Sequence, residues 1–391
     1  MQRIREGLNM NIFQKIREYF PCVKERIFLN HAGVSPLCIP VSEAIQGYLK
    51  NKVSGEEEDF DVDSARKLFA QLINASSEEV ALVPNTSTGL SIAANLLKYP
   101  RSSNVVTTDL EFPSVVYPWL RIKMISNLEI RYVKNIKGRL RLEDFEKAVN
   151  DDTVAVVISH VEYGNGFKND LKAIAEIAHE HGALIVVDAC QSAGAMNIDV
   201  KRQEIDFLAT SCYKWLLGPS GAGFLYVKRD LIEEAEPIFV GWASVKHEIF
   251  ETVDLWNNTQ LVLSETARRF EIGTPSLLSY VGATAALELI LKCGIEKIEN
   301  RIMELTNYLI EKLKEDGFTI QTPQDSSNRS GIVNFKTSKP KEKVEKLHQK
   351  GVIVSARMNG IRVSPHFYNT KDDLERFLEY LKEIEDQPSG S

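Results

Sequence analysis

Short apolar runs alternate with amphipathic helical patterns between residues 80 and 227, and this alternation constrains the fold most strongly. The runs are rich in Val, Ile and Leu, which is typical of strands buried on both faces of a parallel sheet. Strands are expected at 80–83, 104–107, 129–133, 154–159, 184–187, 207–210 and 223–227. We therefore predict an α/β fold in which helices cover both faces of a mostly parallel sheet.

The regular alternation ends near residue 251, and Gly273-Thr274-Pro275 interrupts the chain before a long helical pattern at 277–291. Further helical patterns and short strands then predict a second, smaller α+β unit. The predicted organisation is an N-terminal helical segment packing on the small domain (1–25), a large domain (26–276), the small C-terminal domain (277–385) and a tail (386–391).

The composition is that of an ordinary globular protein. Lys and Arg number 47 against 54 Asp and Glu, a net charge of −7, with no basic block of the kind that binds nucleic acid. We expect no membrane contact, because no apolar run reaches about 18 residues, and a cytoplasmic location, because the N-terminus lacks the apolar core of a signal peptide. The five cysteines are scattered without a CxxC pair, so reduced thiols and no metal site are expected.

Lys214 stands in a core-like sequence, after an apolar strand and before Trp215-Leu216-Leu217. Such a lysine either extends to the surface, the ordinary interpretation, or works in a pocket. Asp188 ends an apolar strand and Gln191 follows it, at the edge of the sheet where α/β proteins bind ligands. A buried amine and a carboxylate are what pyridoxal phosphate requires of a protein. We predict that Lys214 forms the Schiff base, with its pKa lowered by burial, and that Asp188 holds the ring nitrogen.

The phosphate of this cofactor needs donors, and hydroxyl groups cluster before an expected helix at 90–97. Helix N-termini bind anions, although the same hydroxyls could simply cap the helix. Phe112 follows a strand end and is expected to lie over the cofactor ring, unless it is an ordinary core residue. The candidate phosphate ligands are Thr86, Ser87, Thr88, Ser211 and Tyr213.

These residues resemble those of the class V aminotransferase family of pyridoxal-phosphate fold type I, which includes cysteine desulfurases, isopenicillin-N-epimerase-like proteins and kynureninases. The resemblance covers nearly the whole chain, from Asn30-His31-Ala32-Gly33 to the segment 362–369, and is most specific in Asp188-Ala189-Cys190-Gln191 and Ser211-Cys212-Tyr213-Lys214. It implies a transferase fold with a seven-stranded-type sheet in the large domain. It also implies that Gln191 contacts the phenolic oxygen of the cofactor and that Thr86 and Ser211 bind its phosphate.

The resemblance further implies a homodimer in which Thr274 reaches the active site of the partner. Arg362 matches the arginine that clamps the substrate carboxylate, and a bidentate guanidinium suits that task. By itself, Arg362 would be taken for a surface strand residue. Asn30 and His31 are the remaining candidates for substrate binding.

Three departures from the family pattern bear on the reaction. Tyr213 and Phe112 stand where desulfurases have histidines, and the short loop 355–360 lacks the mobile cysteine that carries a persulfide. Cys190 and Cys212 are expected to be inert packing residues. The persulfide route is therefore disfavoured, whereas a lyase that releases sulfur directly needs no such thiol.

The sequence predicts a pyridoxal-phosphate enzyme acting on an α-amino acid, either an aminotransferase or a cysteine desulfurase-like C–S lyase. An isopenicillin-N-epimerase-like epimerase is the alternative, and the sequence does not choose among the reactions. A non-catalytic protein that only binds the cofactor is the competitor from another class, and it has little need for Arg362. The loop at 218–223 is not a dinucleotide fingerprint, because it leads into a strand instead of opening a helix.

Overall fold

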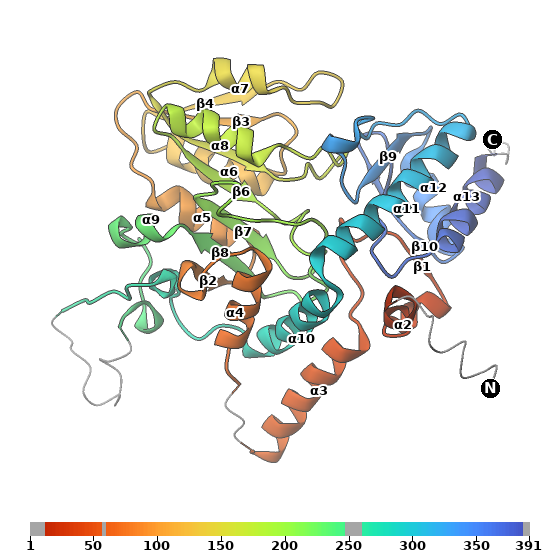
Figure 1. Ribbon diagram of the computed structural model, residues 1–391, viewed down its shortest axis with the longest axis horizontal. Coiled ribbons are helices and arrows are strands. Elements are labelled where there is room, and N and C mark those ends of the chain that lie inside the picture. The colour runs from red at the N-terminus through yellow and green to blue at the C-terminus, as the bar shows by residue number, and fades with distance from the viewer. Residues whose placement is uncertain (1–11, 57–59, 247–259, 386–391) are drawn as a thin grey trace.

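The computed structural model describes residues 12–56, 60–246 and 260–385, and its largest element is a seven-stranded sheet (Figure 1). The strand order is β2-β8-β7-β6-β5-β3-β4, and β8 runs antiparallel to both of its neighbours in an otherwise parallel sheet. The α/β prediction is confirmed. The strands are β2 (Val80–Val83), β3 (Asn104–Thr108), β4 (Glu129–Val133), β5 (Thr153–Ser159), β6 (Leu184–Asp188), β7 (Phe207–Ser211) and β8 (Gly223–Val227).

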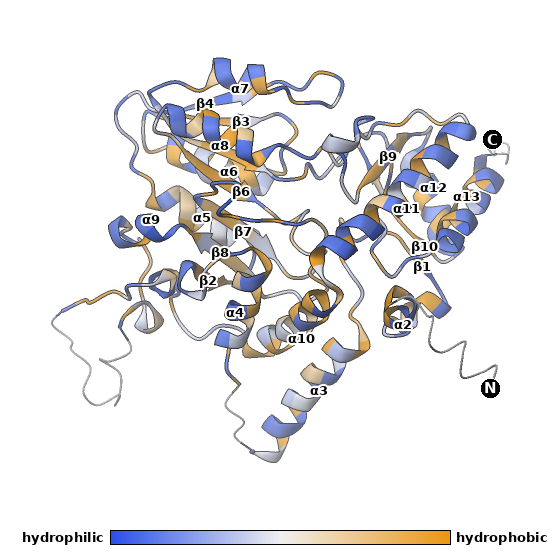
Figure 2. Cartoon of the chain, in the orientation of Figure 1, coloured by the Kyte–Doolittle hydropathy of each residue, from blue (hydrophilic) through white to orange (hydrophobic). Residues whose placement is uncertain are grey.

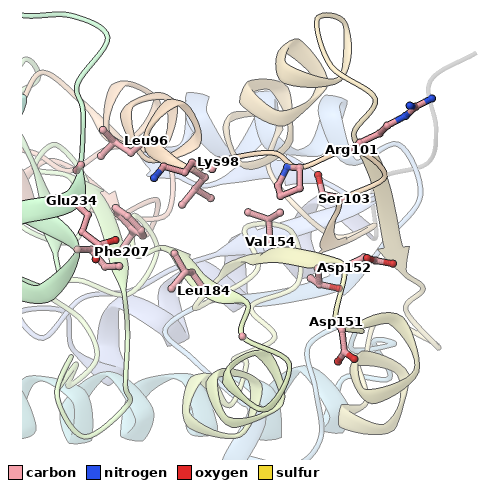
Figure 3. Close-up of a pocket in the computed structure, with 16 residues that line it drawn as sticks. Leu96, Lys98, Arg101, Ser103, Asp151, Asp152, Val154, Leu184, Phe207 and Glu234 are labelled. Atoms are coloured by element: carbon pink, nitrogen blue, oxygen red, sulfur yellow. The ribbon is translucent and has the colours of Figure 1, made fainter.

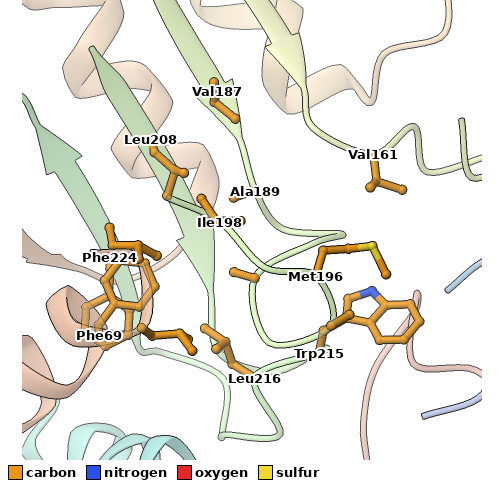
Figure 4. Packing of buried hydrophobic residues seen from close by; sticks show 14 of the residues in the cluster. Phe69, Val161, Val187, Ala189, Met196, Ile198, Leu208, Trp215, Leu216 and Phe224 are labelled. Carbon is orange, nitrogen blue, oxygen red and sulfur yellow. The ribbon is translucent and has the colours of Figure 1, made fainter. Parts of the chain in front are cut away.

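Side chains alternate between two hydrophobic cores because successive residues of a strand point to opposite faces. Val187 belongs to one core and Val186 to the other. In the first core, Phe69 stacks on Phe224 with ring centroids 4.2 Å apart, beside Leu208 (Figure 4). The helices of this unit are α3 (Ile39–Ser54), α4 (Asp63–Leu72), α5 (Thr86–Leu96), α6 (Pro113–Lys123), α7 (Leu142–Ala148), α8 (Leu171–Glu180), α9 (Arg229–Glu234) and α10 (Leu277–Cys293).

The smaller unit, on the right of Figure 1, has its own core, which includes Leu305, Phe335 and Phe377. Its three-stranded antiparallel sheet has the order β11-β12-β9, and a two-stranded parallel sheet pairs β1 with β10. The strands are β1 (Ile27–Phe28), β9 (Val333–Lys336), β10 (Val352–Ile353), β11 (Ser355–Arg357) and β12 (Gly360–Val363), and the helices are α11 (Ile295–Glu315), α12 (Pro340–Gln349) and α13 (Lys371–Glu385).

The N-terminal helix α2 (Ile12–Arg17) lies against the segment that leads into α13. Arg17 forms an ion pair with Asp373 at 2.8 Å, and Phe20 stacks on Tyr368. Short 3-10 helices complete the described chain: η1 (Pro21–Lys24), η2 (Ser77–Glu79), η3 (Trp242–Ser244), η6 (Ala267–Phe270) and η7 (Ser326–Asn328).

Two segments next to the predicted domain boundaries pack in the core of the other unit. Ile27 and Leu29 belong to the core of the small unit, because β1 pairs with β10, although the boundary at residue 26 assigns them to the large domain. α10 packs on α3 and α4 and shares the first core, although the boundary at 277 assigns it to the small domain. The tail at 386–391 and most of the loop 240–263 lie outside the described residues.

Hydropathy follows this layering, since orange prevails on the inner strands of the large sheet, whereas the edge strand β4 and much of α11 and α13 are blue (Figure 2). By length and composition, none of the described helices could cross a membrane alone. Among these helices, α10 and α11 meet the length and composition criteria only together, as a pair bent by 80°.

Candidate active site

A cavity of about 430 Å³ opens at the carboxyl ends of β5, β6 and β7. Ligands of open α/β sheets bind at this edge because the strand ends there deliver side chains into one crevice. Lys214, Asp188 and Gln191 all line the cavity. The lining also includes Thr86, Ser87, Phe112, Ser114, Ser159, Tyr163, Cys190, Ser211 and Tyr213.

A second hollow, of about 400 Å³, lies at the opposite ends of the strands (Figure 3). Its lining mixes the cations Lys98 and Arg101 with the acids Asp151 and Asp152, around the beginnings of β5, β6 and β7. These groups form no constellation of nucleophile and base. The cavity around Lys214 is therefore the candidate active site.

Lys214 follows β7 in a turn in which the N–H of Leu217 donates to the Lys214 carbonyl at 3.0 Å. Its Nζ lies 5.8 Å from the centroid of the Phe112 ring and 5.6 Å from that of Tyr213. Burial acts to lower the pKa of Lys214, but Cys190, Tyr213 and Asp188 outweigh it and the pKa is raised. The expected lowering by burial is therefore wrong for the free amine.

Asp188 ends β6 and is buried, and its Oδ1 accepts a hydrogen bond from the N–H of Cys190 at 2.7 Å. Burial raises the pKa of Asp188 to about 6, against the opposing effects of that N–H and of Lys214. Gln191 is held at both ends of its amide: Nε2 donates to the Ala32 carbonyl at 3.0 Å, and Oε1 accepts from Trp215 Nε1 at 2.9 Å. Its orientation in the cavity is thereby fixed.

Thr86 and Ser211 meet at the N-terminus of α5. The Thr86 N–H donates to Ser211 Oγ at 2.8 Å, and the two hydroxyls lie 2.7 Å apart. Ser87 lines the same cavity and shares a hydrogen bond with Ser114. Thr88 differs, because its N–H and hydroxyl both donate to the capping carboxamide of Asn85 and its side chain lines other hollows. The structure thus does not bring Thr88 to the cavity.

Phe112 stands edge-on to Tyr163, with ring centroids 5.2 Å apart, on the wall of the cavity. The preceding residue, Glu111, accepts hydrogen bonds from the N–H and the hydroxyl of Ser159 at 2.8 and 2.5 Å. Burial raises the pKa of Glu111 to about 8, with a further contribution from Asp188. Glu162 lies nearby with its pKa raised well above the usual value, first by burial and then by Glu111.

Arg362 lies on β12 of the small unit and is buried, immediately behind the cavity wall. Its Nη1 donates to the carbonyl of Tyr163 at 2.7 Å, and its Nε donates to Ser355 Oγ at 3.2 Å. Among the described residues, no carboxylate forms an ion pair with it. Burial, together with the neighbouring Arg357, lowers the pKa of Arg362 to about 9.

Three other predicted residues lie outside this cavity. Both ring nitrogens of His31 are occupied inside the core, by the Ser364 carbonyl and by the Tyr368 hydroxyl, each at 2.9 Å. Asn30 folds against Gly33 and is absent from the lining, so neither residue is placed to contact a substrate here. Thr274 lines a separate hollow with Thr88.

The cavity also holds residues that the sequence analysis missed or misjudged. Ser159 and Tyr163 reach it because β5 ends beside β6, and Ser159 pairs in register with Asp188. The position of Ser159 at the end of an expected strand could have identified it as a cavity residue. No feature of the sequence around Tyr163 does so. Cys190, expected to be inert packing, lines the cavity because it sits between Asp188 and Gln191.

This fold and cavity define a pyridoxal-phosphate-dependent enzyme of fold type I. The family model described as "Aminotransferase class-V" matches residues 27–377. The chain therefore belongs to the class V aminotransferase family, whose members are pyridoxal-phosphate-dependent transferases and lyases.

Individual relatives extend along nearly the full chain. An "Uncharacterized aminotransferase YcbU" of Bacillus subtilis is 34% identical over 373 residues, covering 94% of this chain and 97% of the relative. A "Probable cysteine desulfurase" of Pyrococcus abyssi is 29% identical and covers 96% and 98%. The apo structure of a cysteine desulfurase from Thermococcus onnurineus has a TM-score of 0.86 at 28% identity, covering 96% of this chain and 98% of that one.

The donor set in the cavity fits pyridoxal phosphate. Lys214 offers an amine for the aldehyde, and the buried carboxylate of Asp188 can pair with a protonated ring nitrogen. Thr86 and Ser211 place hydroxyls at the N-terminus of an 11-residue helix, where backbone N–H groups favour a phosphate.

Proposed function

We propose that this enzyme acts on an α-amino acid, by transamination or by C–S cleavage, with Lys214 as the catalytic residue. One observation carries the proposal. Lys214, Asp188 and the Thr86–Ser211 pair share one cavity, and directly behind its wall stands a buried arginine that has no acidic partner among residues 12–56, 60–246 and 260–385. Lys214, Asp188 and the hydroxyl pair match the aldehyde, the ring nitrogen and the phosphate of the cofactor. The arginine matches the carboxylate of an amino acid.

Pyridoxal phosphate, when bound, supplies an aldehyde that condenses with amines and a ring that accepts electron density from Cα. Lys214 would hold the cofactor through its amine and would move the proton at the substrate Cα. The raised pKa of the free amine means that most of it is protonated at neutral pH, so bond formation must follow loss of a proton. Asp188 stabilises a positive charge on the ring nitrogen.

The cofactor is oriented by groups at both of its ends. Thr86, Ser87 and Ser211 bind the phosphate, and Tyr213 contributes its hydroxyl from the edge of the cavity. Phe112 would cover one face of the ring, because its own ring lies on the cavity wall near Lys214 Nζ. Gln191 has its amide oxygen occupied by Trp215, so its remaining N–H is the group available to the phenolic oxygen.

Arg362 binds the α-carboxylate of the substrate. A buried guanidinium normally has a charged partner, because transfer of an unpaired ion out of water costs several kcal/mol. Within the described part of the chain, Arg362 has only a carbonyl and a hydroxyl as acceptors, and the neighbouring Arg357 adds repulsion. The carboxylate of an incoming substrate would neutralise the buried positive charge and accept two parallel hydrogen bonds from the guanidinium.

C–S cleavage by this chain would not use a persulfide on the β11–β12 hairpin. Residues 355–363, which form that hairpin and its turn, contain no cysteine. Direct release of sulfur from the substrate is then the lyase route. The relatives reported above carry aminotransferase or cysteine desulfurase names, so the epimerase alternative is not favoured.

The enzyme works as a homodimer in which Thr274 approaches the phosphate site of the partner subunit. The hollow that holds Thr274 and Thr88 lies at the foot of α5, close to Thr86. Exposed apolar side chains gather beside it, a feature that marks interfaces. They are Ile238, Phe239, Trp242 and Ile272, with exposed fractions of 52–67%.

A panel of amino acids, incubated with the purified enzyme and pyridoxal phosphate, distinguishes the reactions. Keto acid formed only when a keto-acid acceptor is present identifies a transaminase, whereas sulfide from cysteine or cystine without an acceptor identifies the lyase. Optical rotation of each unreacted amino acid reports epimerisation. Lys214→Ala serves as the inactive control, and a protein that binds the cofactor but converts no amino acid would contradict the proposal.

A further inference from the structure

The turn that carries Lys214 is held by hydrogen bonds to the peptide groups on both sides of it. The N–H of Ser35 donates to the carbonyl of Tyr213 at 2.9 Å. On the other side, Nε2 of His366 lies 3.0 Å from the carbonyl oxygen of Trp215. Both residues adjacent to the lysine are therefore tied to segments outside the turn.

The contacts of the His366 ring determine which of its nitrogens carries the proton. Nδ1 accepts a hydrogen bond from the N–H of Phe367 at 2.8 Å, so it has no proton of its own. Burial lowers the pKa of His366 to about 4, against the opposing effect of the Trp215 carbonyl. The ring is thus neutral near pH 7, and its single N–H, at Nε2, donates to the Trp215 carbonyl.

The backbone after Lys214 requires such support because its conformation is unfavourable. Leu217 is buried and has a φ of +60°, a left-handed conformation that residues with a Cβ rarely adopt. A Cβ at Gly194 would collide with the Trp215 carbonyl, so the neighbouring chain packs directly against that carbonyl. The turn is thus closely packed, and His366 contributes a side-chain donor to it.

His366 acts from another part of the fold. It lies between β12 and α13, 151 residues after Trp215, and its side chain is fully buried. It is not among the described residues that line the cavity. Any effect of His366 on the cofactor must therefore pass through the turn that carries Lys214.

We propose that His366 is a positioning residue for Lys214, because its hydrogen bond to the Trp215 carbonyl fixes the direction in which the lysine side chain enters the cavity. The proposal rests on the proposed role of Lys214 in binding the cofactor. Without this hydrogen bond, the amine would approach the aldehyde from a wider range of orientations, which makes bond formation less favourable.

Two forms of the cofactor separate this positioning role from a general effect on the cavity. Pyridoxal phosphate has the aldehyde that bonds to Lys214, whereas pyridoxine phosphate has an alcohol in its place and binds without that bond. Asp188 and the Thr86–Ser211 pair lie on β6, α5 and β7 and can serve both forms equally. A change in the orientation of Lys214 should therefore affect the aldehyde form alone.

Glutamine and methionine have similar shapes, but glutamine can donate a hydrogen bond and methionine cannot. We expect His366→Met to weaken the binding of pyridoxal phosphate to cofactor-free enzyme by about 10-fold, the effect of one lost hydrogen bond. Its affinity for pyridoxine phosphate should not change. His366→Gln should stay within about threefold of the wild type for both forms, and equilibrium titration measures each affinity.

Tyr368→Phe is the matched control, because the Tyr368 hydroxyl lies in the same segment but hydrogen-bonds to His31 instead of the lysine turn. This variant should lose some resistance to urea and keep both affinities of the wild type.

The positioning role is overturned if His366→Met and His366→Gln bind pyridoxal phosphate equally, or if His366→Met weakens the binding of both forms alike. If His366→Met does not fold, as judged by circular dichroism, His366→Gln decides: an affinity for pyridoxal phosphate within about threefold of the wild type supports the proposal, and a loss of about 10-fold overturns it. Borohydride reduction and peptide mass spectrometry of the wild type separate these failures from that of the proposed function. If wild-type Lys214 is never labelled, the role of Lys214 itself is wrong.

Discussion

Arg362 is buried, and no carboxylate in the described part of the chain pairs with its guanidinium, so another group must compensate for the charge. Lysine keeps the charge but loses the planar pair of donors that a carboxylate accepts. We therefore expect Arg362→Lys to raise KM for the amino acid by about 10- to 100-fold, with little change in cofactor absorbance. Steady-state kinetics measures the first quantity, and a spectrum of the same sample measures the second.

Arg357→Lys is the matched control, because Arg357 is exposed and its Nη1 donates to the carbonyl of its neighbour Ala356. Its KM should stay close to that of the wild type. If Arg362→Lys loses the cofactor instead of substrate affinity, Arg362 supports the fold of the site and does not clamp the substrate.

Glu111 makes stability depend on pH. Its pKa is about 8 in the folded protein against 4.5 for an ordinary glutamate, so the folded state retains a proton that the unfolded state releases. The stability from this proton is fully present below about pH 4.5 and is lost as the pH rises through about 8. Urea midpoints measured from pH 5 to 9 should therefore fall less in Glu111→Gln than in the wild type.

Glu162 is buried beside Glu111 and its pKa is also raised, so Glu111→Gln should reduce the dependence of the urea midpoint on pH without abolishing it. Glu146→Gln, on the exposed face of α7, should retain the wild-type slope. Identical slopes in Glu111→Gln and the wild type would mean that Glu111 is ionised in the folded protein.

Sequence patterns alone could identify those cavity residues whose side-chain type contrasts with their neighbours. Lys214 and Asp188 interrupt apolar segments, and Thr86 with Ser211 supplies hydroxyls beside predicted elements. Tyr163 and Glu111 could not be found, because their roles arise from contacts between segments distant in the sequence. The partners of His31 could not be found either, since Ser364 and Tyr368, which hydrogen-bond to its ring nitrogens, lie more than 300 residues away in the sequence.

At the scale of elements, α5 carries Thr86 and rests directly on the sheet. A Cβ at Gly89 would lie 2.8 Å from the Cβ of Ala209 on β7. Gly89→Ala should therefore push α5 outward, lowering the free energy of unfolding by about 1–3 kcal/mol. It should also weaken pyridoxal-phosphate binding, because Thr86 moves away from Ser211 on β7.

Gly47→Ala in α3 is the matched control, because a Cβ there meets nothing within 4 Å. It should stabilise the protein by about 0.5–1 kcal/mol, since alanine is the better helix former. Urea denaturation and cofactor titration check both variants, and equal cofactor affinity in the two would contradict a positioning role for α5.

Element positions followed from the hydrophobic pattern, but element ends and pairings did not. The strand at 184–187 was predicted one residue short of β6, whereas the helix expected at 90–97 begins at Thr86 because Asn85 caps it. The pairing of β1 with β10 joins segments more than 300 residues apart, and no local pattern encodes it. Ile27 packs in the core of the small unit as a consequence.

For the whole molecule, the proposed dimer buries Ile272, which is 52% exposed in the single chain. Ile272→Asp should place an unpaired charge in the interface and shift the enzyme towards monomers with weaker cofactor binding. Sedimentation velocity and cofactor titration measure the two effects. Val53→Asp, at a position that is 89% exposed on α3, should leave both unchanged, and a monomeric wild type with full activity would contradict the dimer.

The central claim is that Lys214 binds the cofactor. Borohydride reduction of the enzyme loaded with pyridoxal phosphate, followed by peptide mass spectrometry, tests it most directly. The predicted result is a single modified lysine at position 214, with no stable label in Lys214→Ala. A label on another lysine in the wild type, or an undiminished label in Lys214→Ala, would contradict the account.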